Sequence, residues 1–376
     1  MNFIDLKIQY KRIEKSLNPR LLDIMENARF IMGQEVTDLE TQLASYTDTK
    51  HCISCSSGTD ALIMALMALD IREGDAVFLP TFTFFSTGEV VSFLKATPIF
   101  IDVYEDTFNM NVEKLQDGID YVKNNTDLTP KLIIPVDLFG QPADYDEIKK
   151  IAKANNLKVV EDGAQGFGGK IDGKKACSFG DIAATSFFPA KPLGCYGDGG
   201  AVFTDDDMIA EELKSIRIHG QSKGADKYLN ERIGINGRLD TIQAAVLLEK
   251  LKIFDEETKR KNDIVKKYNM KLKDIVSVPY VKHNYFSSWA QYSVLADSSE
   301  KRDLILKTLS DKKIPTAVYY KAPLHTLKLF SDLEYIRKFD YSVSNDISKR
   351  IFSLPMHAYL TDEDIELITS SIKQCF

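Results

Sequence analysis

The sequence predicts an α/β protein with a mostly parallel central sheet and a smaller C-terminal α+β domain. Short apolar runs alternate with helical patterns between residues 49 and 204, as expected for a parallel sheet covered by helices. The length of 376 residues exceeds what one small core needs. A helical region near residue 240 precedes a second set of strand patterns. We therefore expect a large domain over residues 1–250 and a small domain over 251–376.

The predicted strands of the large domain are short apolar runs. They cover residues 51–55, 76–79, 98–102, 132–136, 158–161, 183–188 and 201–204. Helical patterns lie between the early strands, for example at 59–69 and 145–155. Ligands of such sheets bind at the carboxyl ends of the strands. Residues with unusual chemistry at these ends are therefore the first candidates for function.

The C-terminal part begins with a helix predicted over 239–273. Strands are expected around 289–295 and 316–320, and a last helix over 362–374, with Thr361 as its N-cap. The sequence has no internal repeat, low-complexity tract or Pro/Ser-rich linker. We therefore expect the small domain to pack tightly on the large one.

Composition and charge exclude several classes of function. The net charge is 48 minus 55, or −7, without the clusters of Lys and Arg that hold a nucleic-acid backbone. The sequence shows no secretory signal, and its best apolar run, 61–69, is too short to span a membrane. We expect a cytoplasmic protein with neither nucleic acid nor membrane as a partner.

Two of the five cysteines, Cys52 and Cys55, form a CxxC motif. A metal site would need a second ligand pair, which the sequence lacks, and a redox motif would begin a helix. This motif lies in a predicted strand. We therefore interpret the two cysteines as core residues and expect no metal.

A first chemical signal, Ser56 to Asp60, lies between a predicted strand and a helix. Small residues expose backbone N–H groups at a helix N-terminus, and their hydroxyls add donors, so a phosphate is the natural ligand. The motif is not a Walker loop, because it lacks Gly-Lys-Ser/Thr. The same residues would also cap a helix that binds nothing.

Two further signals follow strands later in the chain. Asp162 ends a buried strand, where a carboxylate is costly unless it meets a cation; the alternative is a structural cap. Lys191 is flanked by aromatic residues, proline and glycine, so desolvation would lower its pKa and favour Schiff-base chemistry. A phosphate cradle, an anion for a pyridinium nitrogen and an amine for an aldehyde are the groups that pyridoxal phosphate requires.

These signals belong to an ordered set of motifs. The set comprises Ser57-Gly58-Thr59, Pro80-Thr81-Phe82-Thr83-Phe84, Glu161-Asp162-Gly163-Ala164-Gln165, Ser186 with Lys191, Gly234-Ile235-Asn236-Gly237-Arg238, Ile242-Gln243-Ala244-Ala245 and Pro323-Leu324-His325. In this order the sequence resembles the DegT/DnrJ/StrS family of nucleotide-sugar aminotransferases over nearly its whole length. The resemblance implies the fold type I of pyridoxal-phosphate-dependent transferases, also called the aspartate aminotransferase fold.

The resemblance also implies roles for single residues. Lys191 would form the Schiff base with the cofactor, and Asp162 would pair with the pyridinium nitrogen. The other implied cofactor contacts are Gln165 near the phenolic oxygen, Phe84 stacked on the ring, Gly58, Thr59 and Ser186 on the phosphate, and Asn236 reaching the phosphate from a second subunit. That last contact implies a homodimer with shared active sites. Phe84 could equally be a core aromatic.

The implied reaction moves an amino group from glutamate, which becomes 2-oxoglutarate, to a nucleotide-linked ketosugar. Family members that act at C4 commonly show Lys-x-x-Thr-Thr-Gly-Glu-Gly-Gly. Here Lys191 is followed by Pro-Leu-Gly-Cys-Tyr-Gly-Asp-Gly-Gly, which resembles members that act at C3. The resemblance is especially to those C3-acting members that aminate UDP-2-acetamido-2-deoxy-3-oxo-glucuronate, and it implies a role in surface polysaccharides such as the O-antigen of lipopolysaccharide.

Alternatives remain at this point. One is a C4 aminotransferase for a UDP-, dTDP- or GDP-4-keto-6-deoxysugar, and another is a catalytically silent regulator that binds the cofactor. Candidate substrate contacts are Arg238, Tyr319, Tyr320 and His325. His325 and the two tyrosines could instead be packing residues, and Arg238 could cap the helix that follows it.

Overall fold

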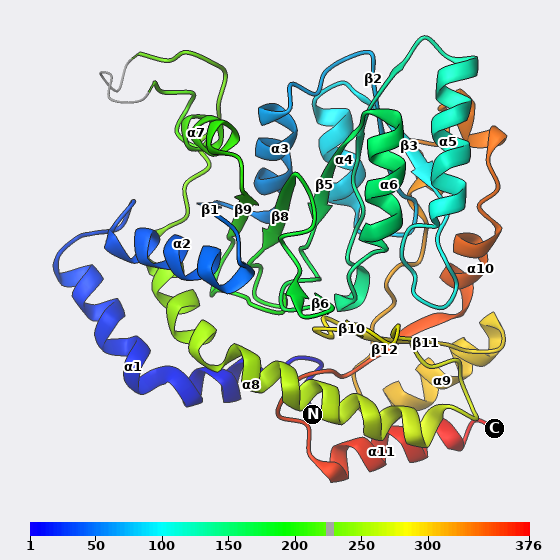
Figure 1. The fold of residues 1–376 in the computed structure, drawn as a ribbon. Helices are drawn as coiled ribbons and strands as arrows, with labels where there is room; N and C mark the ends of the chain where they lie inside the picture. The colour runs from blue at the N-terminus through cyan, green and yellow to red at the C-terminus, as the bar shows by residue number, and fades with distance from the viewer. Residues whose placement is uncertain (223–228) are drawn as a thin grey trace.

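The computed structural model describes residues 1–222 and 229–376. Its centre is a seven-stranded sheet in the order β1-β9-β8-β5-β4-β2-β3 (Figure 1). The strands are β1 (His51–Cys55), β2 (Asp75–Pro80), β3 (Thr97–Ile101), β4 (Thr129–Ile133), β5 (Lys158–Asp162), β8 (Ile182–Ser186) and β9 (Gly200–Thr204). β9 is antiparallel to β1 and β8, whereas the pairs from β8 through β5, β4 and β2 to β3 are parallel. The predicted mostly parallel sheet is confirmed.

Alternate residues of the strands feed two different cores, because successive side chains of a strand point to opposite faces. Ile53 and Val202 join the core beneath α3 (Gly58–Ala68), whereas Cys52 and Phe203 join the core beneath α2 (Gln34–Thr47) and α8 (Thr241–Leu272). Cys55 is fully buried, and this burial raises the pKa of its thiol to about 12. Cys52 and Cys55 are therefore core residues, as predicted.

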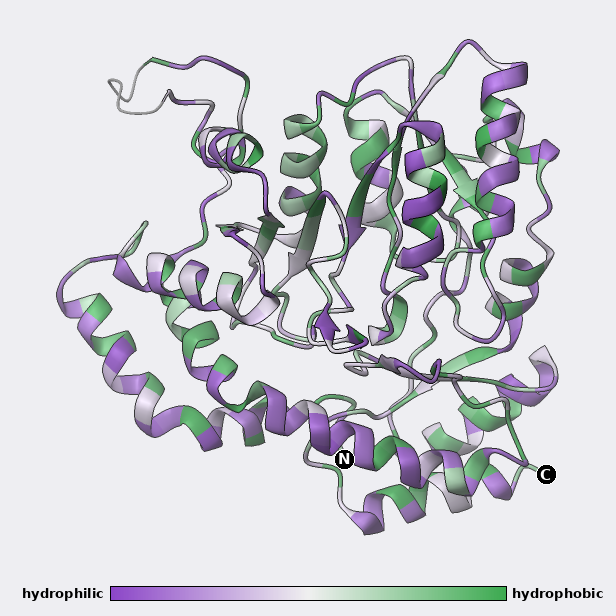
Figure 2. Cartoon of the chain, viewed as in Figure 1, coloured by the Kyte–Doolittle hydropathy of each residue, from purple (hydrophilic) through white to green (hydrophobic). Residues whose placement is uncertain are grey.

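Helices cover both faces of the sheet (Figure 1). They include α4 (Phe85–Phe93), α5 (Val112–Asn125), α6 (Tyr145–Asn155) and α7 (Asp207–Ile216), and the chain starts with α1 (Leu6–Glu26). α3 is hydrophobic over most of its length (Figure 2), and all its side chains from Ala61 to Leu66 are buried. Its N-terminus is thus held firmly at the carboxyl ends of β1 and β8.

The C-terminal part has its own core. It consists of the second half of α8 with β11 (Tyr292–Leu295), α9 (Ser299–Asp311), β12 (Ile351–Leu354) and α11 (Asp362–Lys373). α10 (Ser342–Arg350) instead contributes Ile347 to a separate cluster at the strand ends. α8 runs without interruption from one core to the other, since Leu247 belongs to the first and Ile264 to the second. The predicted boundary at residue 250 falls inside this helix. The division into two domains stays a prediction.

A small three-stranded sheet joins the two parts. It is formed by β6 (Lys170–Ile171), β7 (Lys174–Lys175) and β10 (Tyr285–Phe286). Across the described residues, no helix combines the length and apolarity needed to cross a membrane.

Most predicted elements are confirmed within two residues of their ends. The last helix begins as predicted, because Thr361 accepts a hydrogen bond from the backbone N–H of Asp364 at 3.1 Å. The strand predicted at 132–136 ends at Ile133 and is followed by Pro135, which has no N–H for a ladder. The strand predicted at 316–320 is wrong: the segment makes one isolated bridge, between Ala317 and Ser353.

Candidate active site

A cavity of about 660 Å³ lies at the carboxyl ends of the central strands. Residues that follow β1 and β2 and residues at the ends of β5 and β8 form its base. The segment from Tyr319 to Leu327, in the C-terminal part, supplies the opposite wall. The predicted site residues that line it are Gly58, Thr59, Phe84, Asp162, Gln165, Ser186, Lys191, Tyr319 and Tyr320.

The N-terminus of α3 meets the end of β8 at one side of the cavity. Ser57 caps the helix by accepting the N–H of Asp60 at 3.0 Å. A Cβ added to Gly58 would lie 2.5 Å from Cβ of Ser186, so only glycine allows this approach. The hydroxyl of Thr59 lies 2.9 Å from that of Ser86. Free N–H groups, hydroxyls and the positive end of the helix dipole make this corner suitable for a phosphate dianion.

Asp162 lies at the end of β5 and is 4% exposed. Its Oδ2 accepts a hydrogen bond from Oγ1 of Thr87 at 2.8 Å, and its Oδ1 accepts the N–H of Ala164 at 3.2 Å. Burial raises the pKa of Asp162, while the Thr87 hydroxyl and the charge of Lys191 oppose that rise. A buried carboxylate of this kind is stabilised most by a cationic N–H group.

Lys191 follows β8 in a loop that turns back on itself. Its backbone N–H donates to the carbonyl of Phe188 at 2.8 Å, and the N–H of Cys195 donates to Phe187 at 2.7 Å. Burial lowers the pKa of Lys191, and the charge of Asp162 opposes the change. A lowered pKa increases the fraction of neutral amine, which is the nucleophilic form.

Gln165 and Tyr320 connect the large and C-terminal parts inside the cavity. Oε1 of Gln165 accepts the N–H of Phe139 at 2.9 Å, and Nε2 donates to the Tyr320 hydroxyl at 3.0 Å. The ring of Tyr320 lies 6.4 Å from that of Phe84, centroid to centroid. The amide of Gln165 is therefore held in one orientation, and its second Nε2 N–H has no hydrogen-bond partner in residues 1–222 and 229–376.

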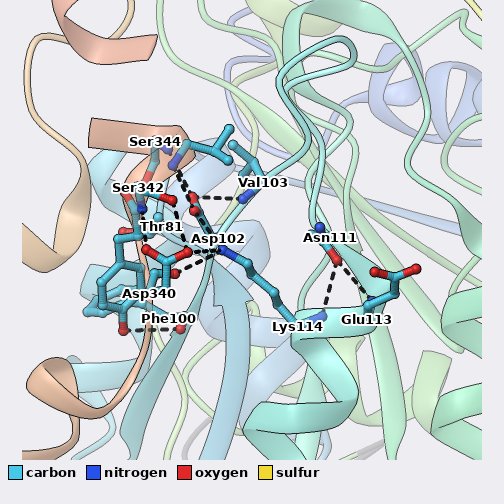
Figure 3. A network of polar contacts seen from close by, with 12 residues as sticks. Thr81, Phe100, Asp102, Val103, Asn111, Glu113, Lys114, Asp340, Ser342 and Ser344 are labelled. Atoms are coloured by element: carbon cyan, nitrogen blue, oxygen red, sulfur yellow. Dashed lines mark hydrogen bonds and ion pairs between the residues drawn. The ribbon is translucent and has the colours of Figure 1, made fainter. Parts of the chain in front are cut away.

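A network of polar contacts around Asp102 joins the C-terminal part to the end of β3 (Figure 3). Asp102, which follows β3, accepts the backbone N–H groups of Val343 and Ser344 at 3.1 and 3.0 Å, and its side chain pairs with Lys114 at 3.2 Å. These bonds satisfy free N–H groups at the start of α10. Leu324 donates its N–H to the carbonyl of Thr81 at 2.8 Å, which fixes the Tyr319–Leu327 wall.

Three predicted contacts do not line the cavity of their own chain. Asn236 is exposed and Arg238 half-buried, in a segment whose Gly237 carbonyl accepts the N–H of Ser56. His325 is 7% exposed; its Nδ1 lies 2.7 Å from the Thr81 hydroxyl and its ring stacks on Tyr341 at 4.0 Å. His325 therefore has the contacts of a packing residue, the alternative left open by the sequence.

The cavity also contains residues that the sequence did not single out. Among them are Asp198, Gln291 and Phe188, and Thr87 lies directly behind Asp162. Thr87 follows Phe84 by three residues, which is about one helical turn. The Pro80–Phe84 motif could therefore have pointed to Thr87 as a residue near the site. Asp198 is the one position of 193–200 that reaches the cavity; the rest of that stretch packs, as when Tyr196 donates its N–H to Gln243 at 2.9 Å.

The donor set fits pyridoxal phosphate. A phosphate corner, a buried carboxylate and a half-buried amine with a lowered pKa border one cavity, and these are the protein groups that the cofactor needs. In residues 1–222 and 229–376, no group of three His, Cys, Asp or Glu side chains could hold a metal ion.

Comparison with known proteins gives a family match over residues 11–373, to the DegT/DnrJ/EryC1/StrS aminotransferase family. The UDP-2-acetamido-2-deoxy-3-oxo-D-glucuronate aminotransferase of Pseudomonas aeruginosa is 40% identical over 99% of both chains. A pleiotropic regulatory protein of Geobacillus stearothermophilus is 36% identical over 99% of this chain and 98% of its own. The UDP-N-acetyl-3-dehydro-alpha-D-glucosamine 3-aminotransferase of Acidithiobacillus ferrooxidans is 33% identical over 99% and 96%.

Solved structures agree with these matches. A DegT/DnrJ/EryC1/StrS aminotransferase from Brucella abortus superposes with a TM-score of 0.95 at 45% identity, covering 100% of this chain and 99% of its own. The PLP form of a protein described as a sugar aminotransferase from Streptococcus pneumoniae superposes with a TM-score of 0.86 at 26% identity, covering 96% of both chains.

Proposed function

The chain belongs to the DegT/DnrJ/EryC1/StrS aminotransferase family, and we propose that it transfers an amino group from L-glutamate to C3 of UDP-2-acetamido-2-deoxy-3-oxo-glucuronate. It is a pyridoxal-phosphate-dependent sugar aminotransferase of the α/β fold described above. The product would serve the synthesis of a surface polysaccharide such as the O-antigen of lipopolysaccharide.

One observation carries the choice of substrate. The Pseudomonas aeruginosa enzyme named for this 3-oxo-glucuronate matches 99% of the chain at 40% identity. The stretch after Lys191 supports the same choice, because it lacks the Thr-Thr pair of members that act at C4. The Acidithiobacillus enzyme, whose name also specifies position 3, is a more distant relative at 33% identity.

The cavity suggests which residues would hold the cofactor. Gly58, Thr59 and Ser186 would bind the phosphate at the start of α3, where the N–H groups and hydroxyls gather. Asp162 would face the ring nitrogen. Lys191 would join the aldehyde carbon. The bound cofactor supplies an electron sink that makes the α-proton of an amino acid acidic.

The protein's own groups supply the acid–base chemistry. Nζ of Lys191, whose pKa is lowered by burial, would take a proton from the α-carbon of glutamate and deliver it to the cofactor. The Asp162 carboxylate accepts hydrogen bonds from Thr87 and Ala164. It would stabilise the protonated ring nitrogen of the cofactor. Phe84 and Tyr320 line the cavity as neighbouring rings and, once the site is filled, would limit the access of water to the reacting atoms.

The reactants carry more negative charge than one cavity can balance. Lys191 is the one basic side chain among the described residues that line it, whereas Asp162 and Asp198 are acidic. Glutamate, the cofactor phosphate and a nucleotide diphosphate all bring anions to the site. A second subunit would supply the missing donors, and Asn236 and Arg238, which lie outside their own cavity, are the proposed contributors.

Exposed apolar residues support this homodimer. Phe84 and Phe188, at the cavity, are 53% and 51% exposed. Phe30, Ile31 and Met32 are 45%, 53% and 41% exposed, and Ile31 pairs with Asp240 near the Asn236–Arg238 segment. Clustered exposed apolar side chains mark interaction surfaces. A second copy that delivers Asn236 to the cavity would cover both groups.

Substrate specificity can be tested directly. The purified enzyme, given saturating glutamate, is assayed against UDP-, dTDP- and GDP-linked ketosugars that carry the keto group at C3 or C4. We expect turnover of UDP-linked 3-ketosugars, with the highest kcat/KM on the 2-acetamido uronate. Turnover of 4-ketosugars alone would contradict the C3 assignment and leave the aminotransferase assignment intact.

Arg238 is the proposed ligand of the sugar carboxylate. Nε of Arg238 is buried without a hydrogen-bond partner in the described chain, and a guanidinium binds a carboxylate through two parallel hydrogen bonds. Arg238→Lys should lower kcat/KM on the uronate more than on a neutral 3-ketosugar. An equal loss on both would point to the amino donor or to the scaffold.

Two alternatives have different outcomes in the same assays. A C4 aminotransferase would process 4-ketosugars. A silent regulator, the class suggested by the name of the Geobacillus relative, would bind the cofactor and turn over none of the sugars.

We place the enzyme in the cytoplasm, because all five cysteines are free, as is usual in a reducing compartment.

A further inference from the structure

The contact between Thr87 and Asp162 is the shortest hydrogen bond made by the carboxylate at the cavity base. Oγ1 of Thr87 donates to Oδ2 of Asp162 at 2.8 Å, across 75 positions of sequence. Thr87 lies in the first turn of α4 and is 1% exposed. It does not line the cavity, so it would act on a bound ligand through Asp162.

We propose that Thr87 is a positioning residue that keeps Asp162 ionised and turns it toward the cofactor's ring nitrogen. This inference rests on the proposed role of Asp162 in binding that nitrogen. The second donor to the carboxylate, the N–H of Ala164, is longer at 3.2 Å and comes from the neighbouring backbone. Of these two donors, the Thr87 hydroxyl is therefore the one that a side-chain substitution can remove.

The proposed effect of Thr87 depends on one proton, which Asp162 and the ring nitrogen of the cofactor would share. A buried carboxylate without a donor becomes more basic, because burial favours its neutral form. Asp162 would then compete with the ring nitrogen for the proton between them. A neutral ring nitrogen is a poor electron sink. The Thr87 hydroxyl thus acts through Asp162 to hold the proton on the ring.

The first turn of α4 gives Thr87 its place. Phe84 caps this helix, and the N–H of Thr87 donates to its carbonyl at 3.3 Å. The hydroxyl of Thr83 lies 3.4 Å from that of Thr87, too far to fix it firmly. The first turn of α4 therefore places the Phe84 ring in the lining of the cavity and the Thr87 hydroxyl behind Asp162.

The test compares variants of similar shape in the cofactor-loaded enzyme. Thr87→Val removes the hydroxyl, Thr87→Ser keeps it, and Thr369→Val is a matched control in α11, where a buried hydroxyl donates to the backbone carbonyl of Ile365 at 2.9 Å. The readouts are kcat and KM for glutamate, and the ¹⁵N chemical shift of ring-labelled pyridoxal phosphate bound to each protein. The shift reports directly whether the ring nitrogen is protonated.

We expect Thr87→Val to lower kcat about tenfold, with KM within about twofold, since a hydrogen bond to a charged group is lost. Its ¹⁵N signal should move toward that of a neutral ring, Thr87→Ser should restore both values, and Thr369→Val should change neither. A wild-type ¹⁵N signal with unchanged kcat in Thr87→Val would overturn the inference, provided that Asp162→Asn moves the signal. If Asp162→Asn leaves the signal unmoved, the proposed role of Asp162 fails first.

Discussion

Replacing Gly58 with alanine should loosen the phosphate corner while leaving most of the fold intact. The added Cβ would lie 2.5 Å from Cβ of Ser186, against at least 3.4 Å for ordinary contact. The helix start and the strand end must therefore separate by about 0.9 Å (3.4 minus 2.5). Overpacking of this kind costs about 1–3 kcal/mol, which corresponds to a Kd about 5- to 150-fold higher when the strain falls on the binding site.

The assay is a titration of cofactor-free enzyme with pyridoxal phosphate, followed by absorbance. The control is Gly118→Ala, in α5 and away from the cavity. Its added Cβ would lie 2.7 Å from the flexible end of the Ile101 side chain. The control should keep the wild-type Kd, although its Tm can change. A wild-type Kd in folded Gly58→Ala would refute the reasoning that Gly58 and Ser186 together form the phosphate site.

Other predictions concern the acid, the amine and the second subunit. Asp162→Asn should retain the cofactor but slow the half-reaction with glutamate on the order of hundredfold, because a neutral amide cannot hold a cationic N–H; a near-native rate would reassign Asp162 as a structural cap. Capture of pyridoxal phosphate by cofactor-free enzyme needs neutral Lys191, whose pKa lies below its usual 10.5 through burial, so in stopped flow the rate should level off below that pH. Asp162→Asn removes the charge that raises this pKa, so the midpoint should fall further, and a rise would contradict the electrostatics. Asn236→Ala should weaken cofactor binding without dissociating the dimer, and sedimentation showing an active monomer would contradict the shared site.

The sequence predicted the strands of the large domain well, because their runs of apolar residues can be buried only in the centre of a sheet that helices cover on both faces. β1 and α6 match their predicted ends, and the acid of β5 and the lysine after β8 meet at one cavity because parallel strands end at the same edge. The segment 316–320 misled the prediction. Its β-branched and aromatic residues suit a strand, but Val318, Tyr319 and Tyr320 pack against the core at the strand ends instead.

Long-range contacts explain what the sequence could not predict. Thr87 reaches Asp162 across 75 positions, and no local pattern reports such a pair. His325 reaches Thr81 across 244 positions, which gives it a buried partner and removes it from the cavity. Asn236 and Arg238 pose a different problem, since neither lines the cavity of its own chain. Their proposed roles depend on a second subunit.

The central claim is that Lys191 carries the cofactor, and chemical trapping tests it most directly. The purified enzyme is reduced with borohydride, digested and mapped by mass spectrometry. We predict a pyridoxyl-phosphate adduct on Lys191, and none in Lys191→Ala prepared in the same way. An adduct on another lysine, or no adduct on a folded and cofactor-supplied enzyme, would contradict the assignment.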